Sequence, residues 1–181
     1  MSLLEEVVRD LERHTAAGGW DAPPRLYALV PSAELRTAEP ELADELGIGA
    51  DGETLAALEQ PELPAQGSVE ESLATIAWPD AVAGCALVIE RVVLPPEAED
   101  GIPDDEAEAA AWIAAHPGRE DVRMIVGVLR DGTRHSALRL RRHDSDDEVL
   151  LGPDLVPALA DALALTLEPD EPDDDGEPSA G

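Results

Sequence analysis

Two stretches of alternating apolar and polar residues, 122–130 and 134–142, are separated only by Asp131-Gly132-Thr133. Alternation with a period of two is typical of β-strands, and a short Asp-Gly connection between two such stretches is typical of a hairpin. A hairpin commits the chain to antiparallel pairing, so this feature limits the fold more than any other in the sequence. With a three-residue loop, the expected pairs are Met124 with Leu140, Val126 with Leu138 and Val128 with Ser136.

This pairing gives the hairpin two unlike faces. One face is apolar and is expected to lie against the core, whereas the other carries Arg123, His135, Arg139 and Arg141. The guanidinium group presents a planar fork of donors that suits a carboxylate or a phosphate. We therefore predict that this basic strand face binds a partner, either an acidic protein or another anion. The alternative is that these cations only offset the charge of an acidic chain.

The remaining patterns predict four helices and two more strands. Apolar residues recur at helical spacing over residues 3–17, where Ser2 and Glu5 form a capping box. Further helices are expected over 69–76, over 104–115 and after an N-cap at Asp154. The added strands are Leu26–Val30 and Cys85–Leu94, and the second is expected at the centre of a sheet because its middle is apolar on both faces.

These elements define an expected fold class and domain organisation. The fold class is α+β, with a mostly antiparallel four-stranded sheet and helices packed on one face. Residues 1–167 are expected to form a single α+β domain, within which 37–67 form an acidic, partly flexible loop. Residues 168–181 carry seven acidic residues and no basic one, and this composition predicts a disordered acidic tail.

The stretch GWDAPPRLYALV, residues 18–29, is interpreted as a stiff joint between the first helix and the first strand. Pro23 and Pro24 hold the chain extended, and Trp20 is expected to fold back onto the apolar core. Asp21 is expected to cap backbone amides or to pair with Arg25. A catalytic Asp21 is the alternative, but no second acid, base or nucleophile accompanies it. Structural roles are also assigned to Trp78 and Pro79, which end the helix before them.

Charge and composition exclude several functions. The net charge is −29 and all twelve basic residues are Arg, so the chain as a whole repels nucleic acid and anionic lipid. The first residues, MSLLEEVVRD, are acidic where a signal peptide is basic, and the longest apolar run is too short to span a bilayer. Cys85 is the only cysteine, which excludes an internal disulfide. We therefore expect a cytoplasmic protein that binds no nucleic acid and no membrane.

The motifs that suggest a cofactor or a metal are weak. Residues 47–52 match G-x-G-x-x-G, but an acidic, helix-like stretch precedes them where a dinucleotide site needs a strand. The acidic cluster at 144–148 lacks the glycine of a calcium loop, and the histidines do not have zinc-site spacing. We expect neither a cofactor nor a metal.

The most consistent prediction is a non-enzymatic, cytoplasmic protein-binding or adaptor module that uses the basic strand face. The alternative is a small hydrolase-like or ligand-binding enzyme with a site near Glu90, His116 and His135. Glu90 is the most notable of these three because it lies inside the strongest predicted strand.

Four blocks of the sequence point to a family. They are GWDAPPRLYALVPSAEL, IAWPDAVAGCALVIERVVLPPEAE, HPGREDVRMIVGVLRDG and GPDLVPALADALALTL. Together they resemble a family of short, acidic, uncharacterised actinobacterial proteins, over about residues 2–167. The resemblance implies a cytoplasmic actinobacterial protein and brings no catalytic residue with it, because the family has no assigned activity.

Overall fold

The computed structural model describes residues 2–45, 54–60 and 69–168, and in this part of the chain it contains one antiparallel sheet of six strands. The strands lie in the order β2-β1-β3-β4-β5-β6, and each pairs antiparallel with its neighbours. Their bounds are β1 Arg25–Pro31, β2 Leu55–Glu59, β3 Gly84–Val93, β4 Glu120–Leu129, β5 Arg134–Leu140 and β6 Leu150–Gly152. The α+β class and the antiparallel sheet are confirmed, and β3 is central as predicted.

The prediction of four strands was wrong, because each edge of the sheet carries one more. β2 lies inside the expected loop 37–67 and pairs with β1, from Tyr27 opposite Glu59 to Pro31 opposite Leu55. β6 is only three residues long and pairs with β5. The flexibility predicted for 37–67 falls partly on 46–53 and 61–68, which lie outside the described residues, as do the G-x-G-x-x-G stretch and the tail beyond Glu168.

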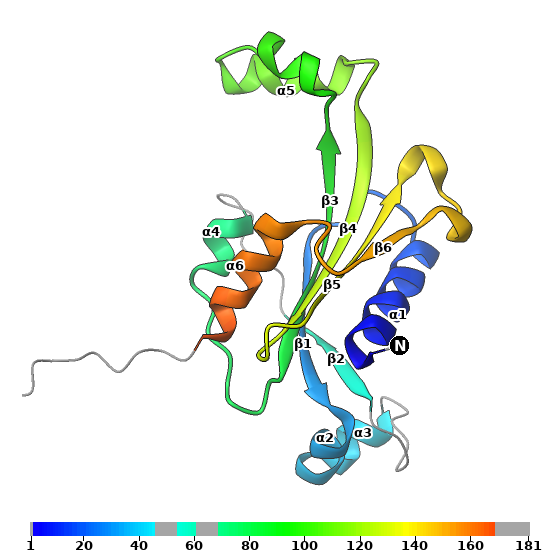
Figure 1. Cartoon of the computed structure of the whole chain (residues 1–181), viewed down its shortest axis with the longest axis vertical. Helices are drawn as coiled ribbons and strands as arrows, with labels where there is room; N and C mark the ends of the chain where they lie inside the picture. The colour runs from blue at the N-terminus through cyan, green and yellow to red at the C-terminus, as the bar shows by residue number, and fades with distance from the viewer. Residues whose placement is uncertain (1, 46–53, 61–68, 169–181) are drawn as a thin grey trace, which may run out of the picture.

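Helices cover both faces of the sheet, not one as predicted (Figure 1). The helices are α1 Leu3–Ala17, α2 Ser32–Ala38, α3 Pro40–Glu45, α4 Val69–Leu73, α5 Glu106–Ala115 and α6 Pro157–Leu167. α1 packs on one face, while α4 and α6 pack on the other. The cause is the central strand, since Leu87 faces one core and Val88 faces the other, and both need an apolar cover.

α1 lies very close to the sheet. The predicted capping box at its start is present, with the Ser2 side chain accepting from the Glu5 amide and the Glu5 side chain accepting from the Ser2 amide. Gly127 of β4 lies directly under the helix, and a Cβ there would be 2.8 Å from Cδ1 of Leu4. The absence of a side chain at Gly127 therefore allows the close approach that buries Leu4 and Val8.

On the opposite face, α6 covers the other core. It begins at Pro157, in the first helical position, and Val156 is its N-cap, so the predicted N-cap at Asp154 was wrong. Trp78 donates to the Thr166 hydroxyl of this helix at 2.9 Å. The guanidinium of Arg130 donates to four backbone carbonyls, those of Trp78, Pro79, Val82 and Leu167, and so ties the end of α6 to the segment before β3.

The β4–β5 hairpin forms with a different register from the expected one. Val122 pairs with Leu140, Met124 with Leu138 and Val126 with Ser136, a shift of two residues. An even shift leaves the faces unchanged, so the predicted separation of apolar and cationic side chains stands. Leu129 and Thr133 close the turn, in which Gly132 adopts a φ of 91°.

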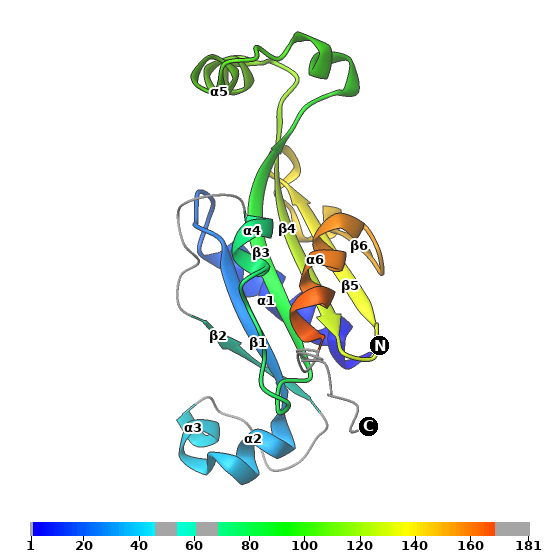
Figure 2. The same ribbon diagram turned by 90° about the vertical axis from the view of Figure 1, so that its left-hand side faces the viewer.

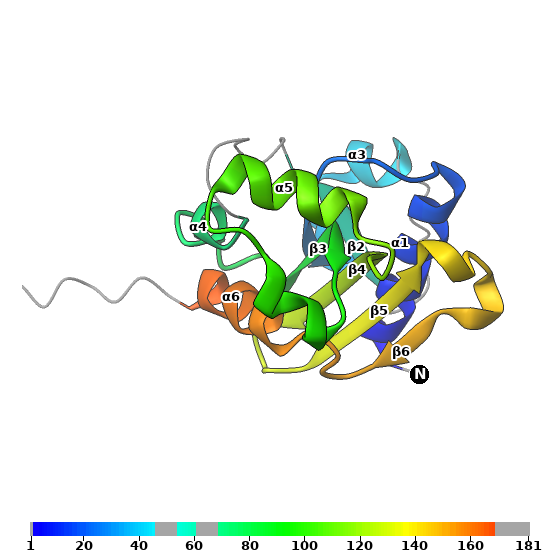
Figure 3. The same cartoon turned by 90° about the horizontal axis from the view of Figure 1, so that it is seen from above.

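The ends of β3 and β4 continue beyond the other strands and carry an arm, which we define as residues 94–118 (Figure 2). Figure 3 shows α5 of this arm from above. The arm contains a short 3₁₀ helix, Pro96–Gly101, and α5. Two shorter 3₁₀ helices, Arg141–His143 and Asp146–Glu148, connect β5 to β6. None of the described helices is both long and apolar enough to cross a membrane.

Candidate functional site

The predicted basic strand face lies beneath α1 and the segment that follows it. Arg123 and Arg139 are opposite each other on β4 and β5, and they are only 1% and 3% exposed. His135 is 8% exposed. The expectation that these three residues form a solvent-facing surface was therefore wrong, because a second layer of chain covers this side of the sheet. Only Arg141, just after β5, keeps its guanidinium at the surface.

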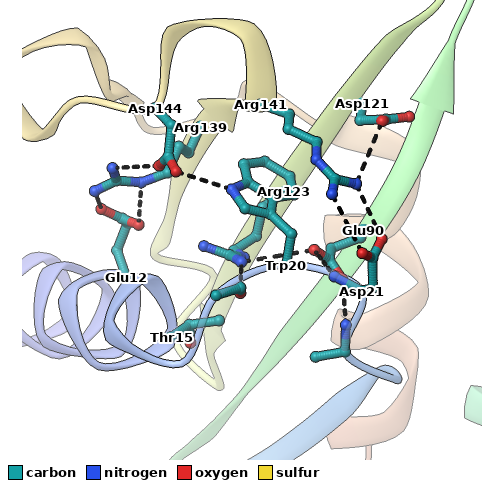
Figure 4. A network of polar contacts seen from close by, with 12 residues as sticks. Glu12, Thr15, Trp20, Asp21, Glu90, Asp121, Arg123, Arg139, Arg141 and Asp144 are labelled. Atoms are coloured by element: carbon teal, nitrogen blue, oxygen red, sulfur yellow. Dashed lines mark hydrogen bonds and ion pairs between the residues drawn. The ribbon is translucent and has the colours of Figure 1, made fainter.

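Arg139 takes part in a buried ion network with α1. Its Nε and Nη2 donate to the two carboxylate oxygens of Glu12 at 3.0 and 2.5 Å, and its Nη1 donates to Asp144 at 2.9 Å. This is the bidentate geometry for which the guanidinium fork is suited. Hydrogen bonds from Trp20 and Arg139 lower the pKa of Asp144. The network joins the first helix to the end of the sheet (Figure 4).

Arg123 holds the segment that leaves α1. It donates to the carbonyl of Gly19, lies 3.6 Å from Glu90, and stacks on the ring of Trp20 with 4.3 Å between its Cζ and the ring centroid. The indole N–H of Trp20 donates to Asp144 at 3.1 Å. Cζ of Arg141 also lies 5.7 Å from the centroid of the same ring. Trp20 therefore contacts two guanidinium groups and is not the apolar lid on the core that we expected. Within the described residues, Nε and Nη1 of Arg123 have no hydrogen-bond partner.

Glu90 fixes the backbone of the same segment. Its carboxylate accepts from the amides of Asp21 and Ala22, at 3.0 and 2.7 Å. Asp21 itself adopts a φ of 68°, in the left-handed region that few residues other than glycine occupy. Glu90 is thus the acceptor that keeps this conformation in place.

The side chain of Asp21 pairs with Arg141. The two carboxylate oxygens accept from Nη1 and Nη2 of Arg141 at 3.0 and 3.2 Å. The predicted pairing of Asp21 with Arg25 was wrong, since Arg25 lies 3.7 Å from Glu59 of β2. The prediction that the Asp21 side chain caps backbone amides was also wrong. The backbone amide of Asp21 instead donates to Glu90, and the carboxylate of Asp21 binds the guanidinium of Arg141.

A hollow of about 620 Å³ opens beside this pair, at the base of the arm, and we call it the Arg141 groove. Its walls are residues 20–23, the end of β3 at 90–92, and Arg119, Asp121 and Arg141. A second hollow of about 350 Å³ shares the last three residues and reaches His116 and Arg142. Residues 20–23, interpreted from the sequence only as part of a joint, therefore also form one wall of this hollow.

The three residues of the enzyme alternative lie in different places. Glu90 lines the Arg141 groove and is engaged with backbone amides. His116 ends α5, accepts from the amide of Gly118 and packs against Trp112. His135 lies opposite Gly127, and its burial lowers its pKa. The structure brings Glu90 and His116 to neighbouring hollows but leaves His135 apart, and among the described residues no three or more His, Cys, Asp or Glu side chains form a metal-binding group.

Some residues of the network were missed from the sequence. Glu12 and Asp121 were not singled out as partners of the arginines, and Asp144 was expected to offset Arg141 and Arg142, whereas it binds Arg139. A signal existed for Glu12, because Leu4, Val8, Glu12 and Thr15 recur at helical spacing along the buried side of α1. A carboxylate within an apolar stripe requires a cation opposite it. Asp121 and Asp144 carry no comparable local signal.

The fold and the site define a two-faced α+β protein with a buried arginine–carboxylate network and an open groove beside it. The chain belongs to the family described as PPA1309-like protein, whose family model matches residues 4–168. This confirms the resemblance to an uncharacterised family. Comparisons with curated proteins and with solved structures return no match.

Proposed function

We propose that this protein is a non-enzymatic protein-binding module and that the arm is its docking surface. One observation carries the proposal: α5 is a complete ten-residue helix in which no residue is buried. A helix in a globular protein normally gains its stability by packing an apolar face against a core. Here no core lies against the helix, and its surface is offered to a partner instead.

The arm is ordered by its own contacts. Asp105 caps α5 by accepting from the Glu108 amide at 3.1 Å. Trp112 packs on Gly101, where a Cβ would lie 3.1 Å from the indole ring, and on His116. The arm therefore presents a defined shape, which lowers the entropic cost of binding.

The exposed part of the arm is apolar as well as acidic. Val92 and Val93, the last two residues of β3 before the arm, are 45% and 44% exposed. On α5 the exposed positions after Glu108 are alanines, Ala110, Ala111, Ala114 and Ala115. We propose that these exposed apolar side chains act together as the contact surface, as large apolar patches do at protein interaction sites.

The charge of the arm selects the partner. Residues 94–118 carry seven acidic residues and no Lys or Arg. The complementary partner is a protein with an apolar strip bordered by basic side chains, and the net charge of −29 attracts it over a long range. This differs from the acidic partner expected from the sequence, because Arg123, His135 and Arg139 are used inside the fold.

We propose that the protein acts in the cytoplasm of an actinobacterium. The support for this setting is the composition, with twelve arginines, no lysine and a single cysteine. The compartment is relevant because the partner has to be a basic protein of the same cell.

Site-specific photocrosslinking tests the proposal. A photoreactive residue at Ala110 in the full chain, expressed in the host, is expected to capture a basic protein, whereas one at Leu165, an apolar position 65% exposed on α6, is expected not to capture it. The matched variants are Ala111→Arg, expected to abolish capture at Ala110, and Leu165→Arg, expected to leave it unchanged. Absence of any product from the arm contradicts the binding module, and equal capture with both variants contradicts the arm as its surface.

A further inference from the structure

The Arg141 groove has the features of a binding site for a small ligand. Its volume of about 620 Å³ falls within the range of roughly 300–1,000 Å³ that small-molecule sites occupy. It lies outside the arm proper, so its role does not depend on the docking function proposed above. Both charged and apolar side chains line it.

The groove is locally neutral in a strongly acidic protein. Three arginines, Arg91, Arg119 and Arg141, and three acids, Asp21, Glu90 and Asp121, line its walls. Glu90 is turned toward the backbone amides of the Trp20 segment, residues 18–24. An anion that is repelled elsewhere by the net charge of −29 meets no such excess here.

Two guanidinium groups converge on one point of the wall. Nη2 of Arg119 and Nη1 of Arg141 both lie 3.6 Å from the same oxygen, Oδ2 of Asp121. This distance is longer than a hydrogen bond, so neither contact is a close one. Arg119 is held in position by donating to the carbonyl of Ala114 at 3.0 Å. The pair therefore forms a corner of two guanidinium groups that are offset by Asp121 and Asp21 but held closely only by Asp21, and an oxyanion can enter it by taking the place of that carboxylate.

The carboxylate of Asp21 accepts hydrogen bonds from both terminal nitrogens of the Arg141 guanidinium. The side chain of Asp21 is 76% exposed, and ion pairs this exposed are weak. Its carboxylate is presented by a backbone with a φ of 68°, fixed by Glu90 and by the contact between Arg123 and Gly19 (Figure 4). The arrangement resembles a ligand carboxylate bound to an arginine, with the protein supplying the carboxylate itself.

Apolar side chains stand beside this corner. Trp20, Pro23 and Val92 line the same hollow. A bare inorganic ion leaves them uncovered, whereas an anionic group attached to an apolar or planar body covers them. We propose that the Arg141 groove binds a small organic anion, whose carboxylate or phosphate group replaces the carboxylate of Asp21 on Arg141.

Titration of the full-length protein with defined probes, followed by the amide NMR signals of residues 20–22, tests this assignment. Benzoate and phenyl phosphate represent the two anionic groups, and benzamide is the neutral control for benzoate. Both anions are expected to shift these signals in a saturable way and benzamide is expected not to. The tighter of the two identifies the anionic group. Equal binding of benzamide and benzoate contradicts the proposal, and so does inorganic phosphate binding as tightly as phenyl phosphate.

Variants separate a binding role from a structural one. Asp21→Asn removes the internal competitor and keeps a residue that tolerates the left-handed region, so the affinity for the anion rises. If the Asp21 pair is formed about nine-tenths of the time, the gain is about tenfold. Asp21→Gly is the second variant with the same expectation. Arg141→Gln is expected to abolish binding, and Arg134→Gln, at an arginine paired with Asp154 and Asp161, is expected to leave it unchanged.

The outcome for Asp21 decides between the two roles. A purely structural Asp21 gives unchanged or weaker binding when it is replaced, and that result contradicts the proposal. Saturable binding that is equal in wild type and Arg141→Gln contradicts it as well. Absence of saturable binding of either anion, in the wild type and in both Asp21 variants, overturns it. The arm experiment reads a different surface, so either proposal can fail alone.

Discussion

Glu12 links α1 to the sheet through a buried charge pair. Its carboxylate receives two hydrogen bonds from Arg139, and both side chains are almost completely buried, at 6% and 3% exposure. Removing one member of a buried pair leaves the other charge without adequate compensation. Removing one member therefore lowers the free energy of unfolding strongly, even though an intact buried pair contributes little net stability.

Glu12→Ala is therefore expected to lower the free energy of unfolding by roughly 3–5 kcal/mol. The matched control on the same helix is Arg13→Gln, because Arg13 and Asp10 form an exposed pair worth roughly 0–1 kcal/mol. Urea denaturation of the two variants measures the difference. A loss for Glu12→Ala no larger than that for Arg13→Gln means that Arg139 is satisfied without Glu12.

Cys85 gives the protein a pH-dependent stability term. Burial raises its pKa from 9.0 to about 11. Between these values the unfolded chain releases the thiol proton and the folded chain keeps it. The contribution of Cys85 to the free energy of unfolding is therefore fully present below about pH 9 and is lost as the pH rises toward 11. The slope is about 1.4 kcal/mol per pH unit.

Comparison of wild type with Cys85→Ala across this pH range isolates the term. The difference in unfolding free energy between them is expected to be constant up to about pH 9 and then to shrink. In the same range iodoacetamide is expected to label Cys85 only after unfolding, because the thiol is 0% exposed. Rapid labelling of the folded protein contradicts this account.

We expect the rest of the fold to be stable without the arm. Pro95 and Gly118 meet at its base, where a Cβ on Gly118 would lie 2.9 Å from Cγ of Pro95. Since α5 buries no residue, removing residues 96–117 and joining Pro95 to Gly118 deletes no core contact.

This excision is expected to change the unfolding midpoint by no more than about 4 °C, which corresponds to about 1 kcal/mol for a chain of this size. The control is Leu159→Ala in α6, at a fully buried position where the expected loss is roughly 2–5 kcal/mol. Thermal unfolding followed by circular dichroism measures both. Loss of a cooperative transition in the excised protein means that the arm does stabilise the sheet.

The elements that could be predicted from the sequence are those with a strong local pattern. α1 has a capping box and an apolar stripe, and β3 has an uninterrupted apolar middle, so both were expected within a residue or two of their bounds. The strand β2, LAALE, has no β-branched residue, and β6 has only three residues. Neither carries a local signal, because each forms only by pairing with an edge already in place.

The candidate site could be predicted only in part, for a related reason. The period of two placed Arg123, Arg139 and His135 on one face correctly, even though the register was wrong by two. Their burial could not be derived, because it depends on α1 and the Trp20 segment returning over that face from more than a hundred residues away. The same long separation joins Asp21 to Arg141.

At the scale of the whole molecule, the charge of −29 opposes folding by self-repulsion. Salt screens this repulsion, and the Debye length falls from about 30 Å at 0.01 M to about 8 Å at 0.15 M. The buried Glu12–Arg139 pair is screened much less than the surface charges.

The unfolding midpoint is therefore expected to rise with salt over this interval, by several degrees. Sodium chloride and choline chloride should act alike, because the effect depends on ionic strength and not on a specific ion. Calorimetry in the two salts measures it. A midpoint that falls with salt means that exposed ion pairs, such as Arg134 with Asp161, contribute more than the repulsion does.

The link between Glu12 and Arg139 also sets a time. The two residues are 127 positions apart, so at a synthesis rate of roughly 5–20 residues per second Arg139 leaves the ribosome about 6–25 s after Glu12. Through most of that interval α1 has neither its charge partner nor Gly127, the residue against which Leu4 and Val8 pack. The helix made early is therefore among the last to be covered, and its apolar side stays open to other proteins until the hairpin arrives.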